Sequence, residues 1–165
     1  MQAKGFTLIE LLTTVAVLAI LVTLAVPSFR TMLMNNRLQA TRTDLMSAFT
    51  FAKSEAVKRG IPVYVTALGP AAGNEFAGGW QVWVDSNANG SQEAGEPTIR
   101  QHEAYPPATT VAATPAVTAV GFNGRGFLIG PQVTLNICDG RSGVRGGQIT
   151  LTSAGTIYLR EDYLC

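Results

Sequence analysis

The sequence predicts an α+β fold in which one long N-terminal helix, half transmembrane and half amphipathic, packs on an antiparallel β-rich head. Three observations lead to this prediction. An apolar run extends from Phe6 to Val26, apolar residues then recur at helical spacing as far as Arg59, and strand-like runs separated by Gly, Pro and Asn fill the remainder. With 165 residues, 47% hydrophobic and 14% charged, the chain can form one ordinary domain and one further element.

The apolar run matches a membrane-spanning helix better than a signal peptide or a buried helix. Its length is close to the roughly 20 residues that cross a bilayer. A cleaved secretory signal would have a short apolar core followed by a small-residue cleavage site. Lys4 and the free amino terminus precede the run, which predicts a cytoplasmic N-terminus. We therefore expect a single-pass inner-membrane protein whose head lies in the periplasm.

Glu10 interrupts this apolar run. A carboxylate at membrane depth costs a few kcal/mol on insertion scales, so its charge needs compensation. One interpretation is that the side chain extends toward the headgroups near the helix end. The other is that a nearby cation pairs with it, because a buried carboxylate keeps its charge more cheaply beside a positive group.

The start of the chain, "KGFTLIELL", resembles the class III signal of type IV prepilins and type II secretion pseudopilins. In that family a prepilin peptidase cuts between the positions that match Gly5 and Phe6 and then N-methylates the new terminus. The resemblance implies that residues 1–5 are a leader peptide and that Phe6 becomes the methylated terminus. It also implies an assembly role for Glu10, whose carboxylate would meet the terminal amine of a neighbouring subunit and fix the axial register.

The helix is expected to run from about Phe6 to Arg59. Pro27 lies where prepilin-like proteins commonly have a helix-breaking proline, and its missing N–H predicts a kink. Gly60 and Pro62 predict the stop. The expected organisation is therefore a transmembrane or filament-core segment (6–27), an amphipathic half (28–60) and a β-rich head (61–165). The core face of the amphipathic half is expected to comprise Leu38, Leu45, Phe49, Ala52 and Ala56.

The head is expected to contain short antiparallel strands. The stretch 104–116 contains several prolines, so we expect it to be a surface loop. In the run "WQVWV", Trp80 and Trp83 alternate in side, which predicts one tryptophan in the core and one partly exposed. The expected strands cover residues 62–67, 80–84, 98–103, 117–122, 126–129, 133–138, 147–152 and 156–161.

Several stretches of the head resemble the GspH/FimT family of prepilin-like proteins. They are "FTFAKSEAVKRGIPVYV", "GGWQVWVDSNANG", "FNGRGF" and "CDGRSG...GGQITLTSAGTI". The resemblance implies a minor type IV pilin of the FimU/FimT kind, which primes pilus assembly and is incorporated at or near the filament tip. The first alternative that it implies is the minor pseudopilin H of a type II secretion system. Expected partners are other major and minor pilins or pseudopilins, the prepilin peptidase and the inner membrane.

The stretch 85–96, "DSNANGSQEAGE", has the spacing of a calcium-binding loop. The candidate ligands are Asp85, Asn87, Asn89, the carbonyl of Ser91, and Glu96. A strand precedes the loop and no helix flanks it, whereas clusters of Asn, Asp and Gly are also ordinary turn chemistry. The sequence favours an Asx-rich hairpin loop without a cofactor, and calcium binding is the alternative.

The two cysteines, Cys138 and Cys165, predict one disulfide in an oxidising compartment. Cys138 ends an expected strand and Cys165 is the last residue printed, so the bond would attach the C-terminal tail to the sheet. Two free thiols are the alternative. Closing such a loop stabilises a domain by about 3 to 4 kcal/mol in chain-entropy estimates.

DNA is a second alternative partner, because some FimT-type relatives in natural transformation are thought to bind it through a Gly-Arg-x-Arg pattern. The corresponding hairpin here reads "GTIYLR", with Thr156 in place of the arginine. Arg141, Arg145 and Arg160 remain as a candidate DNA patch, and solvated loop arginines are the favoured interpretation. The net charge of +1 gives no global basic field to attract nucleic acid.

An enzymatic function is not expected. His102 is the only histidine, and no cysteine or acidic cluster at metal-ligand spacing accompanies it. We expect it to lie on a strand edge without a catalytic role. The sequence therefore predicts a structural protein of filament assembly.

Overall fold

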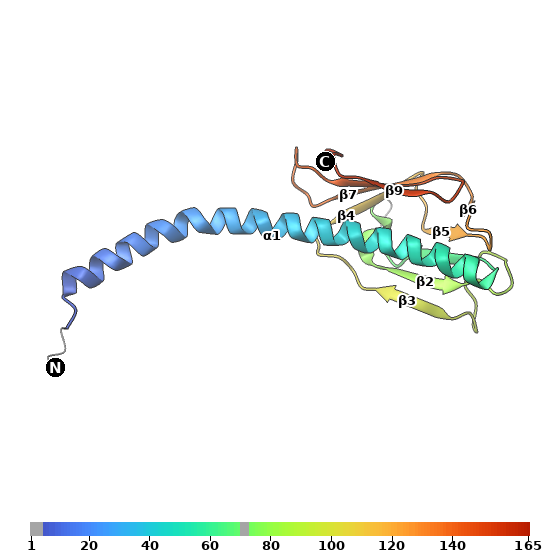
Figure 1. Ribbon diagram of the computed structural model, residues 1–165, viewed down its shortest axis with the longest axis horizontal. Helices are drawn as coiled ribbons and strands as arrows, with labels where there is room; N and C mark the ends of the chain where they lie inside the picture. The colour runs from blue at the N-terminus through green and yellow to red at the C-terminus, as the bar shows by residue number, and fades with distance from the viewer. Residues whose placement is uncertain (1–4, 70–72) are drawn as a thin grey trace. The chain divides into compact units, whose positions relative to one another are not determined.

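A computed structural model describes residues 5–69 and 73–165 of the chain (Figure 1). The first four residues of the expected leader, Lys4 among them, lie outside the described residues. The chain divides into two compact units, with the boundary between Arg37 and Leu38. The first unit is helical, and the second unit, here called the head, contains the rest of that helix and all the strands.

The long helix α1 extends from Leu8 to Arg59 and continues through Pro27 without a break in its α-helical conformation. The expected kink at Pro27 stays a prediction. The expected stop is confirmed: Gly60 adopts φ +71°, and its N–H donates to the carbonyl oxygen of Ala56 at 2.9 Å. This positive φ is easily reached only by glycine, so the helix ends there.

The strands of the head form two sheets in which every pairing is antiparallel, as predicted. The first sheet has the order β3-β2-β1-β5-β6 and the second β4-β7-β8-β9. A short 3₁₀ helix, η1 (Glu75–Gly78), follows β1. The strands are β1 (Val63–Ala67), β2 (Trp80–Val84), β3 (Thr98–His102), β4 (Thr110–Thr114), β5 (Ala119–Phe122), β6 (Leu128–Ile129), β7 (Val133–Cys138), β8 (Gly147–Leu151) and β9 (Ile157–Arg160).

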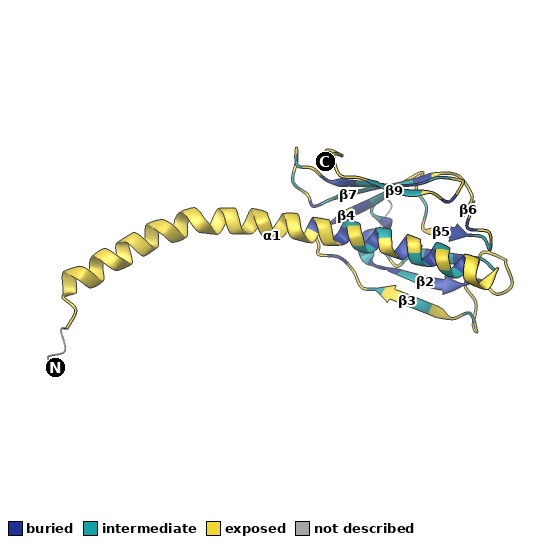
Figure 2. Cartoon of the chain, in the orientation of Figure 1, coloured by how far each residue is buried: buried dark blue, intermediate teal, exposed yellow. Residues whose placement is uncertain are grey.

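The core of the head lies where one face of α1 meets both sheets, and Figure 2 shows the alternation of buried and exposed residues along this part of the helix. Small side chains at Ala48, Ala52 and Ala56 allow the strands to approach the helix closely, and Phe49 fills the space between them. The predicted core face is confirmed, because Leu38, Leu45, Phe49, Ala52 and Ala56 are all buried.

The prediction of a loop over 104–116 is wrong, because β4 lies within it and pairs with β7. The prolines flank the strand, and Val111 and Ala113 between them alternate inward to buried positions. Being an edge strand, β4 needs partners for its outward N–H groups. The N–H of Val111 donates to Asn74 Oδ1 at 2.6 Å, and that of Ala113 to Glu75 Oε2 at 3.2 Å.

The prediction that one of the two tryptophans is partly exposed is also wrong, because Trp83 is only 2% exposed. Its ring stacks on Tyr64 with 5.0 Å between centroids, and its Nε1–H donates to Thr66 Oγ1 at 2.8 Å. Gly90 lies against the same stack, since a Cβ there would be 3.3 Å from the Tyr64 hydroxyl. The loop after β2 therefore covers the sheet face that the alternation pattern assigned to solvent.

Glu75 is a buried carboxylate that closes the edge of β4. Burial alone would raise the pKa of Glu75, but hydrogen bonds from the main-chain N–H groups of Gly73, Glu75 and Ala113 together hold it below the ordinary 4.5. A carboxylate with a lowered pKa stabilises the fold fully above its unfolded pKa, and this contribution is lost as the pH falls through the folded pKa.

We predict that Glu75→Gln lowers the free energy of unfolding at pH 7 by about 1 to 3 kcal/mol, because an amide nitrogen replaces one acceptor of a buried N–H. The difference from the wild type should shrink as the pH falls through the lowered pKa of folded Glu75, because the carboxyl is then protonated in both states. Urea titration of the purified chain at pH 7 and pH 3 measures this. Glu103→Gln, at an exposed glutamate, is the matched control and should change stability little at either pH.

Candidate assembly site

An N-cap hydrogen bond from Thr7 places Glu10 in the first turn of α1. Thr7 precedes the helix, and its Oγ1 accepts the N–H of Glu10 at 3.3 Å, while its carbonyl oxygen accepts the N–H of Leu11 at 3.2 Å. The Thr-x-x-Glu spacing is typical of helix starts, and an acidic side chain there interacts favourably with the helix dipole. The main chain of Glu10 thus lies in the first helical turn, one turn from Phe6, and its carboxylate forms no ion pair within the described part of the chain.

The surface of α1 is almost entirely apolar from Leu8 to Val26, with Glu10 as the only charged residue there. Every residue from Gly5 to Arg37 is exposed, and α1 is long and apolar enough to cross a membrane, with none of its apolar stretch buried. The hydroxyls of Thr13, Thr14 and Thr23 donate to carbonyl oxygens three residues earlier, so these polar groups are satisfied inside the helix. Such a helix can lie in a membrane without unpaired polar groups in its centre.

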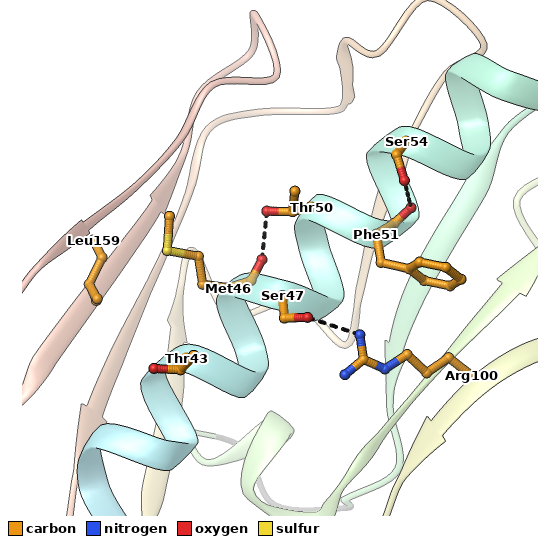
Figure 3. Close-up of a pocket in the computed structure, with 8 residues that line it drawn as sticks. All are labelled: Thr43, Met46, Ser47, Thr50, Phe51, Ser54, Arg100 and Leu159. Carbon is orange, nitrogen blue, oxygen red and sulfur yellow. Dashed lines mark hydrogen bonds between the residues drawn. The ribbon is translucent and has the colours of Figure 1, made fainter.

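A groove lies over the exposed face of α1 in the head, between the edge strands β9 and β3 (Figure 3). Its volume is 460 Å³. The floor consists of helix side chains, mostly small hydroxyl residues with Met46 and Phe51, and the two walls carry Leu159 and Arg100. The lining residues are Thr43, Met46, Ser47, Thr50, Phe51, Ser54, Arg100 and Leu159.

The β3 wall of this groove is held to α1 by Asp44. Its carboxylate accepts a hydrogen bond from the Tyr105 hydroxyl at 2.5 Å and lies 3.4 Å from an Arg100 nitrogen. Burial, reinforced by the Asp44 carboxylate, raises the pKa of Tyr105 well above its ordinary value, so the phenol stays protonated and donates. The Trp80 indole donates to the same hydroxyl at 2.9 Å.

His102, at the end of β3, completes this cluster. Its ring stacks between Trp80 and Tyr105, with centroid distances of 5.6 and 4.5 Å, and its Nε2 lies 3.6 Å from Asp44 Oδ2. Among the described residues no group of three or more His, Cys, Asp or Glu side chains is arranged to hold a metal ion. No pattern in the sequence predicts this cluster, because Asp44 and Tyr105 are 61 positions apart.

The loop 85–96 is held by its own side chains. The buried Asp85 carboxylate accepts N–H groups from Asn89 at 3.2 Å and Gly90 at 2.9 Å, and Glu96 accepts those of Ser86 at 2.8 Å and Glu93 at 3.1 Å. Side-chain oxygens of Asn87 and Asn89 accept further loop N–H groups. This is the bonding expected of an Asx-rich loop. Calcium binding by Asp85, Asn87, Asn89, Ser91 and Glu96 stays a prediction.

The disulfide between Cys138 and Cys165 is formed, as the sequence predicts, with 5.8 Å between the Cα atoms. It attaches the end of the chain to β7. Main-chain bonds extend this attachment: the N–H of Cys165 donates to Val144 at 3.1 Å, and that of Gly146 to Tyr163 at 2.7 Å. Arg42 of α1 donates to the carbonyl oxygen of Arg145 at 2.7 Å, so the helix also holds this loop.

The three arginines of the candidate DNA patch lie near this C-terminal attachment, but two of them are paired with carboxylates. Arg141 bonds Asp139 through two guanidinium nitrogens, and this contact lowers the pKa of the Asp139 carboxyl. Arg160 pairs with Asp162 at 3.2 Å. Acidic neighbours therefore reduce the positive potential available to phosphates.

Two sequence families match this chain. The sequence profile described as "Type II transport protein GspH" matches residues 41–155, which cover most of the head. The chain belongs to the GspH family. A second profile, the prokaryotic N-terminal methylation motif, matches residues 1–26 and includes Gly5, Phe6 and Glu10. The family assignment confirms the resemblance seen in the sequence.

Solved structures share the fold of this GspH-family chain. The type IV minor pilin FimU of Pseudomonas aeruginosa superposes with a TM-score of 0.65 at 24% identity, covering 76% of this chain and 90% of FimU. GspH of Escherichia coli superposes with a TM-score of 0.54 at 12% identity, covering 78% and 90%. A pilin-like protein of Thermus thermophilus, PilA1, is 37% identical over 99 residues, or 58% of this chain. The chain spans only 57% of that relative's length.

We predict that Cys165→Ser lowers the free energy of unfolding by about 3 to 4 kcal/mol, because the loop closed by the disulfide is released in the unfolded state. Urea titration of the purified chain, with and without a reductant, measures this. The reductant should lower the stability of the wild type to that of the variant and leave the variant unchanged. Two reactive thiols in the untreated wild type would contradict the expectation.

We predict that a chelator leaves the melting temperature of the purified chain unchanged, because main-chain N–H groups already occupy the carboxylates of Asp85 and Glu96. Thermal melting in EDTA and in millimolar calcium tests this. A rise in melting temperature with calcium that Glu96→Gln abolishes would support the calcium alternative instead. Glu161→Gln, at an exposed glutamate outside the loop, is the control.

Proposed function

We propose that this chain is a minor type IV pilin that primes pilus assembly and is incorporated at or near the filament tip. The observation that carries the filament role is the position of Glu10, a carboxylate in the first turn of a helix whose apolar surface is fully exposed. The methylation-motif match at residues 1–26 supports cleavage between Gly5 and Phe6 and methylation of Phe6.

The physical role of Glu10 follows from the cost of its charge. Once the leader is removed, the new amine of Phe6 stands one turn from Glu10, and a neighbouring subunit offers the same amine at a matching depth. A carboxylate in an apolar environment gains most from such a pairing, and the pairing is satisfied at only one axial offset. Glu10 therefore selects the register in which apolar helices pack together.

The membrane arrangement in this proposal places the N-terminus in the cytoplasm and the head in the periplasm before assembly. The long apolar helix supports anchoring, and the basic leader supports this orientation. The partners are the prepilin peptidase and other major and minor pilins. No enzymatic role is proposed, because the GspH family to which the chain belongs consists of structural pilins and pseudopilins.

The second candidate is a minor pseudopilin of a type II secretion system. The description of the matching family profile, "Type II transport protein GspH", favours it, whereas the superposition on FimU favours the pilus. The same cleavage, methylation and register physics applies to both. The two differ in the machine that the subunit joins, and DNA binding remains an alternative that no observed feature favours.

We predict that Glu10→Leu leaves membrane insertion intact but reduces incorporation into filaments by about tenfold or more, because the buried amine loses its countercharge. Quantitative immunoblotting of sheared filaments and of the membrane fraction measures this. Thr13→Leu, one turn away, is the matched control and should assemble normally. Normal incorporation of the Glu10→Leu chain would contradict the role of Glu10.

Removal of the leader and methylation of Phe6 can be measured directly. Mass spectrometry of the mature protein should find an N-terminus at Phe6 with one added methyl group. An intact precursor as the working form would contradict both filament candidates together.

A further inference from the structure

The four edges of the two sheets differ in how they are protected. The edge of β4 is closed by Asn74 and Glu75, which accept its outward N–H groups. The edge strand β6 is two residues long, and its Leu128 N–H donates to Ser153 at 3.2 Å. The pairing of β2 with β3 is interrupted by a register shift. Short strands, capped N–H groups and irregularities are the usual devices that prevent a sheet edge from pairing with another chain.

The edge of β9 has no capping side chain and no irregularity, and its one charged residue, Arg160, is paired with Asp162. The N–H of Thr152 donates to the carbonyl oxygen of Thr156 at 3.0 Å, which sets the hydrogen-bonding phase of the β8–β9 hairpin. By alternation, the main-chain groups of Ile157 and Leu159 point away from β8. Within residues 5–69 and 73–165 no hydrogen bond engages these outward groups. The strand contains no proline, lysine or bulge.

The groove over α1 lies directly beside this edge, because Leu159 of β9 forms one of its walls (Figure 3). Met46 and Thr50 line its floor next to Leu159, and they would contact side chains that point inward from a chain lying along β9. The single charged lining residue, Arg100, is already bonded to Asp44 and Ser47. The charge of the groove is therefore compensated, and it suits an uncharged segment.

We propose that β9 is a strand-addition site, at which an extended, uncharged segment of a partner protein, about five residues long, pairs with Ile157 and Leu159. The added strand extends the second sheet across the exposed face of α1 and fills the groove with alternate apolar side chains. Main-chain hydrogen bonds supply affinity, and the groove supplies preference for apolar residues at every second position.

An extended segment fits this site better than a helix. The main-chain N–H and C=O groups of a helix already bond one another. A helix in the groove would therefore displace water from the outward groups of Ile157 and Leu159 without offering them new hydrogen bonds. Each unsatisfied buried group is unfavourable. An extended chain fills the same volume and satisfies both residues. The site goes beyond the filament role of Glu10, because it lies entirely within the head.

The test uses the full chain with an added C-terminal segment, because Cys165 lies beside the start of β8, opposite the end of β9. A flexible Gly/Ser linker of about ten residues, followed by Thr-Val-Thr-Val-Thr, gives the strand an effective concentration near the millimolar range. Amide hydrogen exchange of the purified protein in detergent is the measurement. The amides of Ile157 and Leu159 should exchange at least about tenfold more slowly than in the unextended chain.

Matched variants make the result specific. Thr50→Lys places a charge in the groove and should abolish the slowing, whereas Val57→Lys, at another exposed position of α1 outside the groove, should not. An extension with Asp in place of Val should have no effect. Unchanged exchange with the Val segment, or equal slowing by an Ala-rich helical extension, would overturn the proposal. Neither result depends on filament incorporation, so the proposed function is tested separately.

Discussion

The change in environment along a single helix is the constraint on which the other features depend. Before Leu38 every described residue of α1 is exposed and the surface is apolar as far as Val26, whereas from Leu38 onward one face is buried against two sheets. The first part needs lipid or other helices around it, and the second needs strands. Small residues such as Ala48, Ala52 and Ala56 meet the second need, because they allow both sheets to pack closely on the helix.

Periodicity in the sequence was enough to predict the helix, its core face, its end at Gly60 and most strands. It failed where a long-range contact decided the outcome. Prolines around β4 suggested a loop, but Asn74 and Glu75 lie 37 and 38 positions before the N–H groups that they bond. Strand alternation predicts partial exposure for one of the two tryptophans, because it cannot show that a later loop will cover the face that carries Trp83. The disulfide was predictable because the chain contains only two cysteines.

The candidate site also has one part that the sequence predicts and one part that it does not. Gly5, Phe6 and Glu10 lie within one short motif, so the sequence alone is enough to identify them as candidates, together with the membrane segment. The Asp44 cluster and the groove were not, since they join residues from α1, β3 and β9 that only the tertiary fold brings together. The N-cap role of Thr7 could also have been predicted from the Thr-x-x-Glu spacing, but the same residues belong to the membrane motif, which drew the interpretation.

Many charged side chains of the head form ion pairs with a nearby side chain of opposite charge. Asp44 with Arg100, Glu55 with Arg59, Asp139 with Arg141 and Asp162 with Arg160 are neighbouring pairs, and two of them span only two positions of the chain. Such a surface has little long-range field with which to select partners. Under the two proposals, selection comes from contacts that depend on geometry: the axial offset of Glu10 in the apolar part of α1, and the exposed backbone of β9 in the head. Both require an exact approach of the partner, so both favour ordered assembly over diffuse binding.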